Sequence, residues 1–178
     1  MAGSAALYPT TVWLTGLSGA GKTSIAEALA RRLQGEGRAV YVLDGDRLRH
    51  GLNRDLGFAP QDRRENIRRA AEVARLMNEA GLLVIAAFIS PYREDRAMAA
   101  GIVGVERWCE VHVSTPVEVC EARDPKGLYA RARAGALASF TGVTAPYEAP
   151  LAASLTLDTR ARTVEASADE LYRFLLQP

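Results

Sequence analysis

The sequence predicts an α/β fold in three layers, with helices on both faces of a parallel sheet. Two observations support this fold class. Short apolar segments alternate along the chain with longer segments whose apolar positions have helical spacing. One strand candidate, residues 82–88, is apolar at almost every position, as expected of a central parallel strand covered on both faces. The 178 residues are enough for one domain, residues 1–178, and too few for two ordinary ones.

The first half of the chain is expected to supply three strands and two long helices. Residues 12–15 are a short β-prone run, and residues 24–33 carry apolar side chains at helical spacing. Residues 39–43 are a predicted strand, which delivers an Asp-Gly-Asp sequence to the edge where open α/β sheets bind ligands. Residues 61–80 are expected to form a long helix that stops at Gly81. The predicted buried stripe of this helix consists of Ile67, Ala71, Ala74 and Met77.

The second half adds two strands, two helices and one long irregular segment. Residues 108–113 form a predicted strand. Thr115 and Pro116 are expected to begin a helix that ends at about residue 123. Residues 124–150 lose periodicity and mix basic residues with glycine and proline, which predicts a mobile lid. Residues 155–157 complete the sheet, and Ser167 is expected to cap the closing helix.

A glycine-rich octet follows the first strand and matches the pattern G-x-x-x-x-G-K-[ST] at every position. It consists of Gly16, Leu17, Ser18, Gly19, Ala20, Gly21, Lys22 and Thr23. In such a P-loop, successive backbone N–H groups and the positive end of the helix point at one anion. Lys22 is expected to reach the outer phosphates of ATP, and the Thr23 hydroxyl to bind Mg²⁺. The octet therefore predicts a P-loop NTPase fold with a nucleoside-triphosphate site.

Composition and charge exclude several classes of function. A hydrophobic content of 48% with 24% charged residues is typical of a globular protein. The net charge of +1 argues against nucleic acid as a partner, and no apolar run is long enough for a membrane span. Residues 1–9 show no basic segment followed by an apolar core, so no secretory signal is expected. Cys109 and Cys120 lack metal-ligand spacing and fit buried, reduced thiols of a cytoplasmic protein.

Arginines are concentrated beside the Asp-Gly-Asp sequence, with seven arginines against three acidic residues from position 47 to position 69. Arg49 and Arg63 lie next to that sequence and at the start of the long helix. Planar guanidinium groups there suit recognition of a phosphate or a sulfate. The sequence thus indicates ATP on one side and a small anionic acceptor on the other. For three more arginines a solvated helix face is an equally good interpretation, namely Arg64, Arg68 and Arg69.

A series of motifs, in order from residue 16 to residue 150, resembles the adenylyl-sulfate kinase family. After the octet come LDGD at 43–46, RHGL at 49–52, LGF at 56–58, DR at 62–63, ENIRR at 65–69, FISPYR at 88–93, RDPKGLY at 123–129, ARAG at 132–135, FTG at 140–142 and PYEAP at 146–150. These motifs cover nearly the whole chain and are far more specific together than the octet alone. The resemblance implies an enzyme that uses ATP and Mg²⁺ to phosphorylate the 3′-hydroxyl of adenosine 5′-phosphosulfate (APS). The expected products are 3′-phosphoadenosine 5′-phosphosulfate (PAPS) and ADP, in sulfate assimilation, and the expected assembly is a homodimer.

The resemblance also implies roles for individual residues. Asp46 is expected beside the acceptor hydroxyl, which it would orient or deprotonate, and Lys126 on the lid near the transferring phosphates. Phe58 and Phe140 are expected to sandwich the adenine of APS, and for Phe140 stacking is preferred to burial because it lies in a glycine-rich lid. The expected catalytic residues are Lys22, Asp46, Ser90 and Lys126. The expected APS contacts are Asp44, Asp46, Arg49, Phe58, Arg63, Asn66, Ile89, Ser90, Lys126 and Phe140.

Two roles are open for Ser90. Members of the family have been assigned a phosphoserine intermediate at this position, but the sequence puts no general base beside it. Direct in-line transfer is therefore favoured, with Ser90 as a hydroxyl of the pocket. The sequence departs from the family pattern at Arg47, where an asparagine is frequent, and at Ala130 and Arg131, where a lysine pair is frequent. The second departure removes one positive charge from the lid.

Two other functions stay open on sequence grounds. A related P-loop kinase could act on another small hydroxyl acceptor, such as a sugar, a nucleoside monophosphate or a drug. Such a kinase would not need the arginine, asparagine and phenylalanine residues assigned to the acceptor to act together. A regulatory module that binds nucleotide without turnover would be expected to lose Lys22, Asp46 or Lys126, and the sequence keeps all three.

Overall fold

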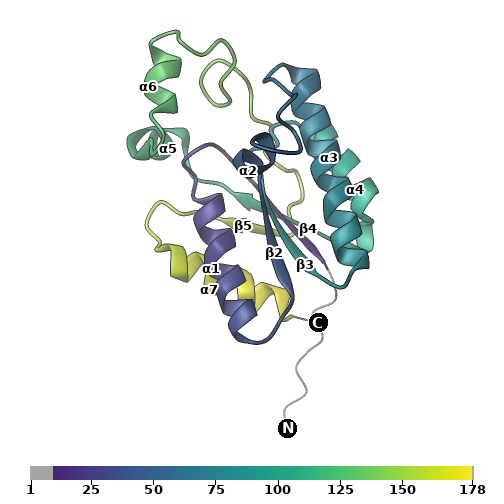
Figure 1. Ribbon diagram of the computed structural model, residues 1–178. Coiled ribbons are helices and arrows are strands. Elements are labelled where there is room, and N and C mark those ends of the chain that lie inside the picture. Colours follow the sequence, from purple (N-terminus) through teal and green to yellow (C-terminus); the bar gives the residue numbers. More distant parts are fainter. Residues whose placement is uncertain (1–9, 178) are drawn as a thin grey trace.

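The computed structural model describes residues 10–177, which form a five-stranded parallel sheet between two layers of helices (Figure 1). The strand order is β2-β3-β1-β4-β5. The strands are β1 (Thr11–Thr15), β2 (Val40–Asp44), β3 (Leu83–Ala87), β4 (Trp108–Val113) and β5 (Leu155–Leu157). The predicted α/β fold class is confirmed. The prediction about a secretory signal in residues 1–9 lies outside the described residues.

Helices cover both faces of the sheet, and each face has its own part of the core. On one face, α1 (Lys22–Gly35) packs against α7 (Val164–Leu175). On the other face, α3 (Pro60–Glu79) packs along α4 (Arg93–Val103), as Figure 1 shows. The short elements are α2 (Gly45–Arg49), the 3₁₀ helix η1 (Val105–Arg107), α5 (Val117–Arg123) and α6 (Leu128–Arg133).

The register of the sheet brings three functional segments to one edge. Leu14 of β1 and Asp44 of β2 both lie opposite Ala87 of β3. The residues that follow these three strands therefore meet at the carboxyl edge, where parallel sheets bind ligands. All five residues of β3 are buried, which confirms its prediction as a central strand.

Helix α3 is amphipathic and keeps its apolar stripe against the sheet. Ile67, Ala71 and Ala74 are buried as predicted, whereas Met77 is only partly buried at the edge of the same cluster. Pro60 occupies the first turn, where its missing N–H group costs no hydrogen bond. Gly81 has a φ of +89°, a backbone conformation that glycine adopts without strain just after a helix.

Three local predictions are corrected by the structure. The cap of α7 is Thr163, whose hydroxyl accepts from the N–H of Ala166, whereas Ser167 lies buried inside the helix. Residues 124–150 are not wholly irregular, because α6 forms within them. Helix α2 was not expected at all. The caps of α2 and α7 are local contacts, but hydrophobic periodicity does not report which polar side chain forms a cap.

The two cysteines behave as structural thiols. Both are unpaired and buried, as predicted. Burial raises the pKa of Cys120, and it raises the pKa of Cys109 to about 11, so both favour the unreactive protonated form. Across residues 10–177, every helix is too short or too polar to cross a membrane.

Candidate active site

The phosphate-binding octet forms a tight loop between β1 and α1, and its glycines permit close packing. Gly16 has a φ of +154°, and a Cβ atom there would lie 2.5 Å from the carbonyl oxygen of Val113. A Cβ atom on Gly19, whose φ is +76°, would lie 2.9 Å from the carbonyl oxygen of Cys120. A larger residue at either position would push the loop away from its neighbours, so both glycines are required by packing as well as by backbone conformation.

Lys22 is the first residue of α1, and its ammonium group folds back over the octet. The Nζ atom donates to the carbonyl oxygens of Gly16 and Leu17, at 2.9 and 2.7 Å. Burial lowers the pKa of Lys22 to about 8. A buried ammonium group above a glycine-rich loop is in position to neutralise a bound phosphate.

Asp44 connects the end of β2 to the octet and to the next helix. Its Oδ2 atom accepts a 2.8 Å hydrogen bond from the hydroxyl of Thr23. Its Oδ1 atom accepts from the backbone N–H groups of Asp46 and Arg47, at 3.0 and 3.2 Å, and thereby caps α2. This cap is the reason that the Asp-Gly-Asp sequence begins a helix.

The oxygen atoms of Thr23 and Asp44 form a pair that fits Mg²⁺. Hard oxygen ligands suit this ion, which is usually held by one or two protein groups together with phosphate and water oxygens. In the part of the chain that the structure describes, no group of three or more His, Cys, Asp or Glu side chains could hold a metal. The residues therefore fit an ion that arrives with a nucleotide better than a permanently bound metal.

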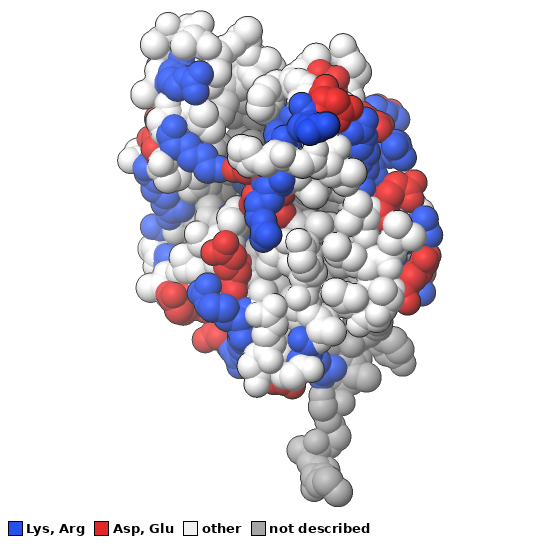
Figure 2. Space-filling view, viewed as in Figure 1, with Lys and Arg blue, Asp and Glu red and all other residues white. Residues whose placement is uncertain are grey.

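Asp46 and Lys126 bring the carboxyl edge of the sheet into contact with the base of the lid segment. Lys126 Nζ forms an ion pair with Asp46 Oδ2, and both side chains are more than half exposed. Burial is the main cause of the low pKa of Lys22, and the charge of Lys126 lowers that pKa further while Asp46 raises it. Two of the four residues predicted to be catalytic, Asp46 and Lys126, are in direct contact, and Lys22 lies on the neighbouring octet. Figure 2 shows the surface hollowed between the lobe that carries α6 and the lobe at the end of α3.

Arg49 and Phe58, which the sequence assigned to the acceptor, lie against one another. The guanidinium carbon of Arg49 is 4.3 Å from the centroid of the Phe58 ring. Arg49 Nη1 also donates to the carbonyl oxygens of Leu56 and Gly57, at 3.2 and 2.9 Å. Burial and, more weakly, the neighbouring charge of Arg63 lower the pKa of Arg49. Phe58 is 63% exposed, so most of its ring surface is open to a planar ligand.

Arg63 joins the start of α3 to the lid segment. Its Nε atom donates to the carbonyl oxygen of Phe58 at 2.8 Å. Its Nη1 and Nη2 atoms donate to the hydroxyl of Thr141 at 2.8 Å and to the carbonyl oxygen of Ser139 at 2.7 Å. The segment 124–150 is thus connected to the start of α3 through one guanidinium group.

Asn66 and Ile89 are two further residues that the sequence assigned to the acceptor. Asn66 is buried on α3, and its Oδ1 atom accepts a 2.9 Å hydrogen bond from Asn53 Nδ2. This contact fixes the orientation of the Asn66 amide. Ile89 follows β3, and its carbonyl oxygen accepts from the hydroxyl of Thr15 at 2.8 Å.

Ser90 is buried, and its hydroxyl is directed toward the core. That hydroxyl accepts a 3.1 Å hydrogen bond from the indole N–H of Trp13, and its other contact is a long one of 3.5 Å to the carbonyl oxygen of Phe88. Neither partner is a general base. Ser90 has a φ of +38°, which is strained for a residue other than glycine, and Arg96 holds its carbonyl oxygen at 2.7 Å.

Phe140 is placed differently from the sequence expectation. It is 7% exposed and packs edge-on against Tyr129, with ring centroids 4.9 Å apart. The preference for an open stacking position over burial is therefore wrong for this structure. Segment 124–150 contributes buried residues because the core on the α1 face extends beneath this segment.

Two residues that hold the site together were not found in the sequence. The hydroxyl of Tyr129 donates to the carbonyl oxygen of Ser18, at 3.0 Å, and so supports the octet from the lid. The buried guanidinium of Arg96 donates to Glu110 Oε1 at 2.6 Å and to the carbonyl oxygen of Glu148 at 2.7 Å. The sequence contains a signal for Arg96, because this residue shares a helix face with small apolar residues of α4. Such a position predicts a buried and therefore paired charge.

The octet, with its lysine and threonine, is followed by Asp46, which pairs with Lys126, and by the arginines Arg49 and Arg63. This combination is typical of the class of P-loop kinases. The model of the adenylylsulphate kinase family matches residues 8–158. The adenylyl-sulfate kinase of Shewanella pealeana is 54% identical over 94% of this chain and 82% of its own length. That of Staphylococcus epidermidis is 51% identical over 92% of this chain and 82% of its own length.

Solved structures give the same result. The structure of the Mycobacterium tuberculosis APS kinase in complex with AMPPNP and APS superposes with a TM-score of 0.92 and 46% sequence identity. The match covers 96% of this chain and 99% of the other. This chain belongs to the adenylyl-sulfate kinase family.

Proposed function

We propose that this protein transfers the γ-phosphoryl group of ATP to the 3′-hydroxyl of adenosine 5′-phosphosulfate. The products are 3′-phosphoadenosine 5′-phosphosulfate and ADP, and the reaction belongs to sulfate assimilation. Membership of the family and the likeness to a relative that holds AMPPNP and APS support both substrates.

The observation that carries the proposal is the place of Asp46 at the start of α2, directly after Asp44, which contacts the octet through Thr23. Asp46 pairs with Lys126, and its charge acts on the pKa of Lys22 on one side and of Arg49 on the other. Burial is the larger cause of both pKa shifts, and the smaller influence of Asp46 on each supports a position of its carboxylate near both groups. A kinase needs such a group where the donor phosphate meets the acceptor hydroxyl.

The residues at this junction divide the work of phosphoryl transfer. Asp46 orients the 3′-hydroxyl of APS and accepts its proton late in a loose transition state. Lys22 and Lys126 neutralise the charge that develops on the transferred group and on the leaving phosphate. Arg49 and Arg63 hold the phosphosulfate, and the exposed ring of Phe58 stacks on the adenine.

Thr23 and Asp44 are the residues that would hold Mg²⁺. Their oxygen atoms lie 2.8 Å apart, with the Thr23 hydroxyl donating to the Asp44 carboxylate. When bound, Mg²⁺ supplies positive charge to the outer phosphates. Asp44 additionally caps α2, and so it keeps Asp46 at the start of that helix in a fixed position.

Transfer is direct, and Ser90 serves as a hydroxyl of the pocket wall. The contacts of its hydroxyl, with an indole N–H group and a carbonyl oxygen, supply no base to make it a nucleophile. Rapid-quench labelling with γ-³²P-ATP tests this role. We expect no labelled protein before APS is added. A phosphorylated Ser90 that APS consumes at the turnover rate would establish the covalent route instead.

The substrate assignment is tested by an ADP-release assay with several acceptors. We expect rapid ADP formation with APS, and only background rates with gluconate or adenosine 5′-monophosphate. A higher kcat/KM with either of these two acceptors would replace APS kinase activity with another kinase activity of the same fold.

Several broader properties are part of the proposal. The chain acts as one domain whose lid, residues 124–150, closes over the substrates, and it works as a homodimer in the cytoplasm. The contacts of the lid with both sides of the site, through Tyr129 and Arg63, support the lid assignment. Light scattering of the purified protein measures the assembly directly, and a monomer at assay concentration would overturn the homodimer.

A further inference from the structure

The acceptor loop, residues 50–58 between α2 and α3, has no helix or strand of its own. It consists mainly of turns and ends at the exposed ring of Phe58. Its internal backbone hydrogen bonds are short in range, such as Arg54 N–H to the carbonyl oxygen of Gly51 at 3.1 Å. The position of the loop therefore depends on what its side chains and carbonyl groups contact outside it.

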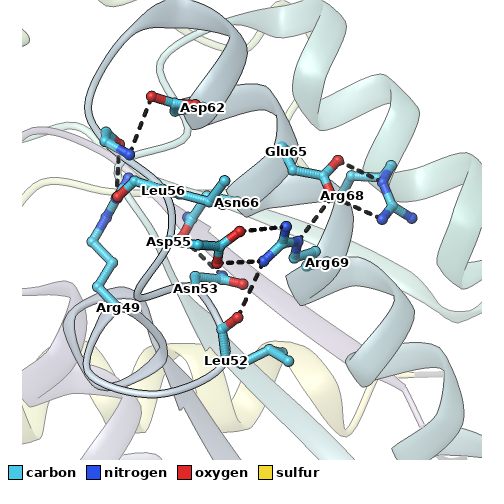
Figure 3. A network of polar contacts seen from close by, with 11 residues as sticks. Arg49, Leu52, Asn53, Asp55, Leu56, Asp62, Glu65, Asn66, Arg68 and Arg69 are labelled. Carbon is cyan, nitrogen blue, oxygen red and sulfur yellow. Dashed lines mark hydrogen bonds and ion pairs between the residues drawn. The ribbon is translucent and has the colours of Figure 1, made fainter.

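Beside the contacts from Arg49 and Arg63 described above, one face of α3 supplies three more (Figure 3). Asp62 Oδ2 accepts from the N–H group of Gly57 at 3.1 Å, and Asn66 accepts from Asn53 at 2.9 Å. Arg69 completes the series one turn further along the helix. Positions 62, 66 and 69 have the i, i+4, i+7 spacing of a single helix face, so the loop lies along this face over two turns.

Arg69 makes the most extensive of these contacts. Its Nη1 atom donates to the carbonyl oxygen of Leu52 at 3.1 Å and to Asp55 Oδ1 at 2.8 Å. Its Nη2 atom donates to Asp55 Oδ2 at 2.9 Å, which makes a bidentate pair. Arg69 therefore grips the middle of the acceptor loop by both its backbone and a side chain.

A second acidic residue sets the orientation of the Arg69 guanidinium. Glu65 Oε1 accepts from Arg69 Nε at 2.8 Å, and the same carboxylate pairs with Arg68. Hydrogen bonds from Arg68 and Arg69 lower the pKa of Glu65 to about 2, so the carboxylate stays charged at neutral pH. With Nε held by Glu65, the two terminal nitrogens are left pointing at the loop, as Figure 3 shows.

We propose that Arg69 is a positioning residue for APS: by holding Leu52 and Asp55 against α3, it sets the place at which Phe58 and Arg49 meet the substrate. The proposal rests on the proposed function, which makes Phe58 and Arg49 part of the acceptor pocket. It also decides between the two interpretations of the basic helix face. Among the described residues, Arg68 forms ion pairs with Glu65 and Glu72 of its own helix, whereas Arg69 also contacts the acceptor loop.

The helix offers a matched control. Arg75 lies on α3 and pairs with Glu72 and Glu79 of the same helix, without contacting the acceptor loop. Arg75→Gln therefore removes a charge and two intrahelical ion pairs, and so it measures the general effect of such a loss on the stability of the helix. Arg69→Gln removes, in addition, the contacts to Leu52 and Asp55.

Steady-state kinetics of the full chain separate the two effects. We expect Arg69→Gln to raise the KM for APS about fivefold, with the KM for ATP and the kcat changed less than about twofold. Arg69→Lys keeps the charge but not the bidentate geometry, and should recover only part of the loss. Arg75→Gln should leave both KM values unchanged. An unchanged KM for APS in Arg69→Gln, or an equal rise in Arg75→Gln, would overturn the proposal.

Two further variants make the outcome specific. In a double-mutant cycle, Asp55→Ala added to Arg69→Gln should raise the KM for APS no further, because both changes remove the same contact. Full additivity would contradict the proposal. Phe58→Ala, assayed in parallel, should raise the KM for APS about tenfold through lost stacking. If Phe58→Ala has no effect, the proposed acceptor pocket itself is wrong. If it has its effect and Arg69→Gln has none, only the positioning role fails.

Discussion

The donor side of the site, comprising the octet and Asp44, is built differently from the acceptor side, comprising Arg49, Phe58, Arg63 and Asn66. The donor side is made mostly by backbone, since its glycines pack closely against neighbouring chain, and its Lys22 is only 8% exposed although Thr23 is exposed. The acceptor side is made by side chains that reach from a loop and a helix, and Phe58 is 63% exposed.

Because of this difference, substitutions on the two sides have different consequences. A change in the donor side disturbs the packing of β1, α1 and β4 together with phosphate binding. A change in the acceptor side alters one contact among a loop, a helix and the lid, and leaves the sheet intact. In the proposed function, the donor side fixes the class of reaction and the acceptor side determines which hydroxyl is phosphorylated.

The largest effect is expected from Lys22→Ala, the most severe change on the donor side. Loss of the ammonium group should weaken ATP binding and transfer together, with kcat/KM for ATP falling about 10³-fold or more. Calorimetry and the ADP-release assay measure the two losses. A variant with unchanged ATP affinity would contradict the role of the octet in holding the outer phosphates.

The next effect tests the junction between the two sides. Asp46→Asn should lower kcat about 10³-fold, because an amide cannot accept the proton of the hydroxyl. ATP affinity should stay within a few-fold of the wild type, since the donor side is untouched. A near-normal kcat in this variant would remove Asp46 from the chemistry.

The buried donor side should also show a pH dependence that the acceptor side lacks. Burial lowers the pKa of Lys22 to about 8 in the folded protein, and bound phosphate favours the charged form. ATP binding above pH 8 must therefore take up a proton, and affinity should fall about tenfold per pH unit there while staying flat at lower pH. Calorimetry in buffers of different ionisation enthalpy counts the proton. A dissociation constant that does not change on the alkaline side of pH 8 would contradict this picture.

Arg63→Lys is expected to have a smaller effect, confined to the acceptor side. Lysine cannot donate to Phe58, Thr141 and Ser139 at once, so the KM for APS should rise about tenfold with little change in the KM for ATP. Equal increases in both values would show that the lid contact serves the donor side as well.

Tyr129→Phe should have the smallest effect of the series, because it removes one hydrogen bond and keeps the ring. Loss of the contact with the Ser18 carbonyl should lower the free energy of unfolding by about 1 kcal/mol. The corresponding decrease in Tm is about 2–4 °C, which calorimetry resolves. A Tm equal to that of the wild type would show that the lid does not brace the octet through this bond.

The donor side and the sheet were predictable from sequence because local patterns encode them. The octet has fixed spacing, and β3 has an unbroken apolar run. The acceptor residues were assigned only through a resemblance over many motifs, because their meeting depends on tertiary contacts. The errors have two causes: Phe140 is buried by the core beneath residues 124–150, which is a tertiary contact, and α2 forms because Asp44 caps it, which is a local contact that apolar periodicity does not report. The contact of Arg69 with the acceptor loop could not be separated from a solvated helix face without coordinates.

The ion pair between Lys126 and Asp46 has a consequence for timing. The pair joins the segment 124–150 to α2 through two side chains that are each more than half exposed. In the proposed function, a phosphate that binds Lys126 competes with this pair and releases the Asp46 carboxylate for the acceptor hydroxyl. Nucleotide binding would then come before engagement of the acceptor by Asp46.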